Sequence, residues 1–211
     1  MSADCVIRVH PETGQPIGMR QQWGIILSGP WETDNAWMVA EGMNTMAEQV
    51  GDELGSQESG DAWVSKMLGD TQFVRWPNNT IPIHPILLLT EIHTLYTKLK
   101  GLEPIWSDGP SGLALPAHYP LLDNDADTIY FFDSMYDTTP VHESAHIIDY
   151  RSGYVSVDMA KSVDLGRSPT EYGKTNRLED FAESWKIWIY DKPGLTGTRR
   201  SFIENLIVQW R

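Results

Sequence analysis

The chain has 211 residues, of which 41% are hydrophobic and 21% charged, and Cys5 is its single cysteine. This composition is typical of a globular protein, and one cysteine excludes both an intramolecular disulfide and a thiolate zinc cluster. The net charge of −13 at pH 7 argues against nucleic acid and anionic membranes as partners and supports a basic peptide only weakly. No apolar run is long enough to span a membrane and no signal peptide is visible, so we expect a soluble protein of open compartment.

The first 76 residues are expected to form short strands followed by two helices. The apolar runs Val6–Val9 and Ile25–Leu27 favour strands. Apolar residues recur at helical spacing from Asp34 to about Leu54, and a shorter helix is expected from Ala62 to Leu68. A brief extended piece, Gln72–Trp76, should follow.

The middle of the chain mixes one helical pattern with turn-rich sequence. A helix is predicted from Ile86 to Lys100, whereas the Pro- and Gly-rich passage from Glu103 to Pro120 has little regular pattern. The run Thr128–Asp133 is a strong strand candidate, which we expect to form the edge of a substrate cleft. Residues 151–175 read as a loop, and a last helix is expected from about Thr198 to Trp210.

The most informative stretch is Val141–Tyr150, which reads as a helix containing an HExxH motif made by His142, Glu143 and His146. Residues four apart lie on one helix face, so both imidazoles can reach one metal ion while Glu143 faces a bound water. This arrangement is the zinc-hydrolase motif. With six His and thirteen Glu, it would arise by chance in roughly one such chain in a hundred, so the context must support it.

The residues after the motif exclude one zinc family. In HExxHxxGxxH, the glycine and third histidine positions are occupied here by Asp149 and Ser152, so the metzincin pattern is absent. Asp149 lies on the same face as His146, and because its side chain is short we expect it to orient that histidine rather than to bind metal.

A carboxylate-rich helix downstream can complete the site. Asn176 is a suitable N-cap for a helix that ends near Pro193. Glu179 and Glu183 are four residues apart and project from one face of it. One carboxylate could therefore bind zinc while the other accepts a hydrogen bond from a ligand histidine.

Over residues 128–190 the combination resembles the gluzincins, and more closely the anthrax lethal factor-like metallopeptidases, which include the Pro-Pro endopeptidases. In that family HExxH is followed by a helix reading E-x-F-A-E, which corresponds here to residues 179–183. The resemblance implies that Glu179 is the third zinc ligand, that Glu183 supports the site, and that Tyr172, seven residues before Glu179, stabilises the transition state. Either Glu183 or Asp180 remains an alternative ligand.

The resemblance also implies a fold and an activity. The expected fold is a single α+β domain over residues 1–211, a mainly helical zincin-like metalloprotease with a small mixed sheet and an HExxH active-site helix. The resemblance does not extend to residues 1–120, which we expect to form an N-terminal lobe beside a catalytic lobe of residues 121–211. The main hypothesis is a zinc-dependent endopeptidase acting on a peptide or protein substrate, with a secreted or delivered toxin or effector as one possible form. The alternatives are a catalytically silent zincin-like binding module and a zinc amidase acting on a non-protein substrate.

Overall fold

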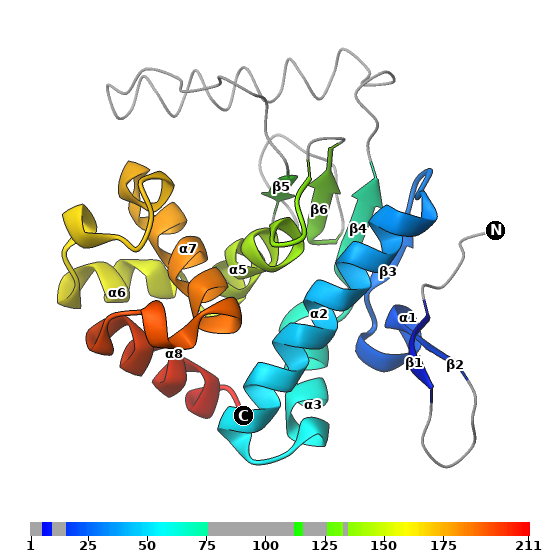
Figure 1. Ribbon diagram of the computed structural model, residues 1–211, viewed down its shortest axis with the longest axis horizontal. Coiled ribbons are helices and arrows are strands. Elements are labelled where there is room, and N and C mark those ends of the chain that lie inside the picture. The colour runs from blue at the N-terminus through cyan, green and yellow to red at the C-terminus, as the bar shows by residue number, and fades with distance from the viewer. Residues whose placement is uncertain (1–5, 10–15, 76–111, 116–125, 133–134) are drawn as a thin grey trace.

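The computed structural model describes residues 6–9, 16–75, 112–115, 126–132 and 135–211 (Figure 1). The helix predicted from Ile86 to Lys100 lies outside these residues. Within them, no helix is both long enough and apolar enough to cross a membrane.

The described strands form two sheets. Strands β1 (Val6–Val9) and β2 (Pro16–Gly18) make an antiparallel pair. The second sheet has the order β3-β4-β6-β5, formed by β3 (Ile26–Ser28), β4 (Gln72–Arg75), β6 (Thr128–Phe131) and β5 (Gly112–Leu115). The first three strands are parallel, and β5 is antiparallel to β6. A small mixed sheet was expected, and these strands form one.

The position of β6 corrects one prediction. The strand at Thr128–Phe131 exists as expected, but it pairs on both sides, with β4 and with β5. Among the described strands, β3 and β5 are the two ends of this sheet, and β5, the neighbour of β6, lies in a passage that the sequence left without regular structure. A cleft edge, if this sheet supplies one, therefore belongs to β5 rather than to β6.

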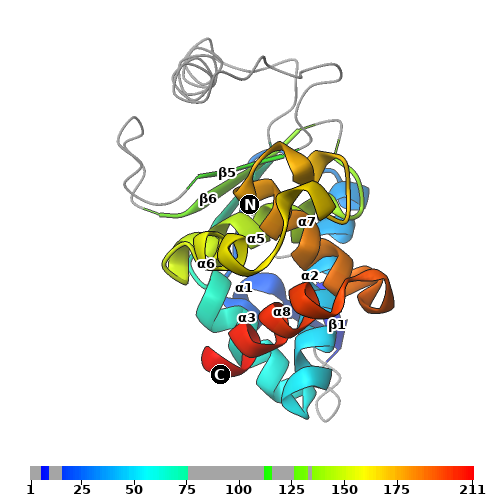
Figure 2. The same cartoon turned by 90° about the vertical axis from the view of Figure 1, so that its left-hand side faces the viewer.

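Helices make up most of the described chain. A short helix, α1 (Met19–Trp23), leads into β3, and α2 (Thr33–Leu54) and α3 (Gln57–Leu68) connect β3 to β4. After β6 come α5 (Thr139–Arg151), α6 (Val155–Ser162), α7 (Arg177–Tyr190) and α8 (Gly197–Gln209), with short 3-10 turns η2 (Leu165–Arg167), η3 (Tyr172–Thr175) and η4 (Lys192–Gly194). In both views α5 lies below β5 and β6 (Figures 1 and 2), and Figure 1 shows α6 and α7 to the left of α5 with α8 below them.

Periodic apolar faces explain the long helices, and one short helix was missed. The predictions for α2 and α7 agree with the structure to within a residue or two, and α3 begins five residues earlier than predicted. The segment expected to be a loop contains α6. Its first residue follows Tyr154, which has a left-handed backbone (φ 63°), a conformation that local sequence does not indicate here.

The hydrophobic core joins the two halves of the chain. Trp63 on α3 stacks on Trp185 of α7 with ring centroids 5.5 Å apart, and Trp188 lies next to Trp185. All three indoles are buried in the same cluster that includes α2, α5 and α8. The indole stack packs α3 against α7, and apolar residues of α5 belong to the same buried cluster, so both helices of the candidate site rest on one core.

The C-terminal end of α5 is anchored to the sheet. Arg151, its last residue, forms an ion pair with Asp127 just before β6 and donates hydrogen bonds to the carbonyls of Met67 and Gly69 before β4. An arginine fork that reaches several acceptors at once restrains both the position and the direction of the helix. The motif residues thus lie on a helix held at its end by the strands beside it.

Candidate metal centre

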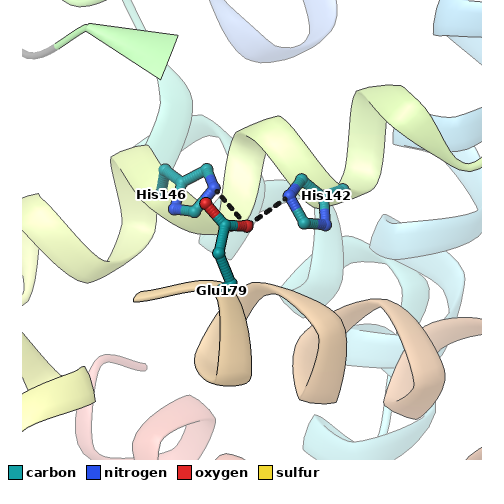
Figure 3. A group of neighbouring side chains, drawn as sticks. All are labelled: His142, His146 and Glu179. Atoms are coloured by element: carbon teal, nitrogen blue, oxygen red, sulfur yellow. Dashed lines mark ion pairs between the residues drawn. The ribbon is translucent and has the colours of Figure 1, made fainter. Parts of the chain in front are cut away.

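His142 and His146 lie one turn apart on α5, as their spacing predicted. The helix begins with Pro140 in its first turn, where the missing N–H of proline costs no hydrogen bond. His142 is buried, and the two imidazole rings meet edge to face with centroids 5.1 Å apart. Both rings point from α5 toward α7 (Figure 3).

Glu179 lies on the facing helix and approaches both histidines. The side chain of Asn176 caps α7 by accepting hydrogen bonds from the N–H groups of Leu178 and Glu179, which sets Glu179 in the first turn. Its Oε2 is 3.1 Å from Nε2 of His142 and 3.5 Å from Nε2 of His146 (Figure 3). The three residues form a group that could hold a metal ion.

The distances between these atoms fit a tetrahedral ion. Ligands about 2.0–2.1 Å from a tetrahedral zinc are about 3.3 Å from one another, and the two distances from Oε2 of Glu179 to the imidazole nitrogens lie on either side of that value. Oε2 of Glu179 is also buried without a well-formed hydrogen bond from the described residues. Buried carboxylate oxygens are normally satisfied, so this atom fits a metal ligand.

Glu183 is the second carboxylate of the predicted pair, and it contacts a candidate ligand histidine. Its Oε1 is 2.8 Å from Nδ1 of His142, on the side of the ring opposite Glu179. The carboxylate also accepts a hydrogen bond from Lys186 at 2.6 Å. The structure therefore brings Glu179 to the Nε2 side of His142 and Glu183 to the Nδ1 side.

The two carboxylates dominate the electrostatics of His142. Burial alone would lower the pKa of this imidazole, but its ion pair with Glu179 and its hydrogen bond with Glu183 outweigh burial and raise the pKa to about 10. For Glu183, burial acts upward, yet the hydrogen bonds from His142 and Lys186 lower the pKa to about 2. The pKa of Glu179 is likewise lowered, against burial, by His146 and His142. Both carboxylates are therefore ionised at neutral pH.

The side chain of Glu143, a residue of α5, faces strand β5. Burial raises the pKa of its carboxyl group, while the neighbouring histidines and a backbone hydrogen bond from Ala114 act in the opposite direction. The side chain packs directly against Gly112: a Cβ at that position would lie 2.5 Å from Cγ and 2.8 Å from Oε1 of Glu143. Strand β5 thus forms one wall of the space that Glu143 occupies.

Tyr172 approaches the metal group from η3. Its ring centroid is 5.8 Å from that of His142, and 57% of the residue is exposed. Desolvation of the phenol, together with the negative charges of Glu179 and Glu143, raises its pKa. The hydroxyl is therefore protonated at neutral pH and can donate a hydrogen bond.

Asp149 and Asp180, the two other residues predicted for the site, instead bond to residues of neighbouring helices. Asp149 was expected to orient His146, but its carboxylate accepts hydrogen bonds from the N–H and Oγ of Ser156, where α6 begins. Asp180 was an alternative third ligand, but both of its oxygens are bonded by Arg199 on α8. That buried ion pair ties α7 to α8 and occupies the carboxylate that a metal would need.

Sequence reasoning missed two residues of this site. Lys186 could have been found, because it lies three positions after Glu183 on the same predicted helix. Gly112 offered no such signal, since its strand was not recognised.

A scan against models of known protein families found no match to this chain, and a search of curated proteins found no relative.

Proposed function

We propose that this chain is a zinc-dependent endopeptidase of the gluzincin type, similar to the lethal factor-like metallopeptidases, in which His142, His146 and Glu179 hold the metal. The observation that carries the proposal is the convergence of these three ligand groups, whose ligand atoms all lie within 4.8 Å of one another, with Glu143 close enough for both imidazoles to act on its pKa. Two imidazoles and one carboxylate are a donor set of catalytic zinc sites, in which a fourth position is open. When bound, zinc supplies a Lewis acid and lowers the pKa of a coordinated water toward about 7.

Glu143 is the general base in this proposal. Its carboxylate follows His142 directly on α5, on the side of the site that faces β5, and the opposing effects of burial and of the neighbouring imidazoles act on its pKa. A carboxylate in this position can take a proton from the attacking water and pass it to the leaving amine. The step requires Glu143 to remain at the site while the scissile amide enters.

Tyr172 and β5 supply the substrate contacts. The protonated phenol of Tyr172 can donate a hydrogen bond to the oxyanion that forms at the scissile carbonyl. Among the described strands, β5 pairs only with β6, so its other edge can receive an extended peptide by strand addition. A peptide on β5 would pass over Glu143, because Gly112 of that strand contacts the Glu143 side chain.

Two measurements on the purified protein test this function. Elemental analysis should give one zinc ion per chain, and mass spectrometry of a peptide library should reveal cleaved products. Glu143→Gln should retain zinc and lower cleavage by about 10²- to 10⁴-fold, the usual contribution of general acid–base catalysis. Cleavage that persists unchanged in this variant would refute the proposed mechanism.

The same experiment separates the alternatives. Zinc binding without cleavage of any peptide, with partner binding indifferent to metal removal, would indicate a silent binding module. Hydrolysis of a non-peptide amide by the parent and not by Glu143→Gln would indicate an amidase. A chain that binds no zinc would refute the metal centre itself.

A further inference from the structure

A lysine on α7 is joined to the candidate metal centre through one carboxylate oxygen. Oε1 of Glu183 lies 2.8 Å from Nδ1 of His142 and accepts a hydrogen bond of 2.6 Å from Nζ of Lys186. Both contacts are made to the same oxygen atom. The result is a continuous chain from Lys186 through Glu183 to His142.

Burial distinguishes this ion pair from others of the same spacing. The side chains of Glu183 and Lys186 are 4% and 22% exposed, whereas those of Asp158 and Lys161, also three residues apart on a helix, are 65% and 71% exposed. An exposed pair contributes little, because water screens it and two long side chains must be ordered. A pair shielded from water restrains its members more strongly.

The position of Glu183 determines how His142 is presented. In the neutral imidazole that binds a metal, a carboxylate at Nδ1 favours the tautomer with the proton on Nδ1, so that the lone pair of Nε2 lies on the side of Glu179 and the metal position. If the Glu183 side chain could turn away, the ring would lose both this tautomer preference and its fixed orientation. Lys186 prevents that movement by holding Oε1 in place.

We propose that Lys186 is a positioning residue of the metal centre, which fixes Glu183 so that His142 presents Nε2 to the metal. This inference rests on the proposed zinc site. It concerns metal binding and does not depend on which substrate is cleaved. Lys186 itself touches neither the metal position nor the reacting atoms.

The test is the zinc affinity of a set of variants, measured by competition with a chromophoric chelator. Lys186→Met should bind zinc about tenfold more weakly, at the lower end of the usual 10- to 100-fold cost of losing an outer partner, and Glu183→Gln should lose at least as much. Lys186→Arg keeps the charge and a donor, so its affinity should return to within roughly threefold of the parent. Lys161→Met, which removes an exposed lysine of the same pair spacing, should bind as the parent does.

A double variant decides whether Lys186 acts through Glu183. Glu183→Gln combined with Lys186→Met should lose no more affinity than Glu183→Gln alone, because the contact is already broken. The visible spectrum of the Co²⁺-substituted protein should change alike in Lys186→Met and Glu183→Gln and be restored in Lys186→Arg. Circular dichroism of every variant verifies that each is folded.

The outcomes that overturn the inference are distinct from those that overturn the proposed function. Parent-like zinc affinity in Lys186→Met, or fully additive losses in the double variant, would refute the role of Lys186 and leave the zinc site intact. Failure of the parent to bind zinc would refute both. Loss of affinity in Lys161→Met equal to that in Lys186→Met would show a general charge effect and would also refute the positioning role.

Discussion

Gly112→Ala should slow catalysis about 100-fold while leaving the metal site in place. Gly112 belongs to β5, whereas His142, His146 and Glu179 come from α5 and α7, so the substitution adds its methyl group away from the ligands. The group that it meets is the side chain of Glu143.

The size of the expected loss of activity follows from the space around Gly112. A Cβ on Gly112 would lie 2.5 Å from Cγ of Glu143 and 2.8 Å from its Cδ and Oε1. Carbon atoms in contact are normally about 3.5–4.0 Å apart, so Glu143 or the strand must move by about 1 Å. Because a misplacement of about 1 Å in an active site can cost about 10²-fold in rate, we expect kcat/KM to fall by about 100-fold.

The assay is cleavage of a peptide identified from the library, measured beside zinc affinity and thermal unfolding. Gly197→Ala is a matched control, since a Cβ at Gly197 has nothing within 4 Å, and it should have parent-like activity. Parent activity in Gly112→Ala would refute the placement of Glu143 beneath β5. A parallel loss of zinc in that variant would refute the separation of the base from the metal ligands.

Three further predictions concern protonation and packing. Because the pKa of His142 is raised to about 10, zinc must displace its proton at neutral pH. The enthalpy of zinc binding should therefore depend on the ionisation enthalpy of the buffer, and the zinc affinity should increase as pH rises. A binding enthalpy that does not depend on the buffer would contradict this. Arg199→Met leaves Asp180 buried without its partner and should cost about 3–5 kcal/mol in urea unfolding; a loss under about 1 kcal/mol would contradict the role of that pair. Trp63→Ala removes the partner of the stack between α3 and α7 and should cost about 3–5 kcal/mol in the same assay, with a parent-like midpoint as the contrary result.

The spacing of apolar residues predicted a helix correctly wherever the residues of that helix alone determine it. The apolar face of α2 and the Asn176 cap of α7 are local signals, and both helices lie where they were expected. The α6 segment differs, because its start depends on hydrogen bonds from Ser156 to Asp149, a residue of the preceding helix. Strand β5 is four residues long and is defined by its pairing with β6, which no local pattern reveals.

The same distinction applies to the candidate site. The spacing within HExxH and between Glu179 and Glu183 is a property of single helices, and it identified both histidines and both carboxylates. Which carboxylate faces Nε2 of His142 depends on how α5 and α7 pack, so the residues alone left that choice open. Gly112 is significant only because another segment crosses it, and its sequence neighbours do not show that.

The order of the ligands along the chain has a consequence for the segment between them. Glu179 follows His146 by 33 positions, and the intervening residues include α6, η3 and Tyr172. An ion held between these two residues would bind the folded chain and hardly the unfolded one, so its binding free energy would add to the free energy of unfolding. The concentration of free metal would then set how stable the folded chain is as well as whether it can act.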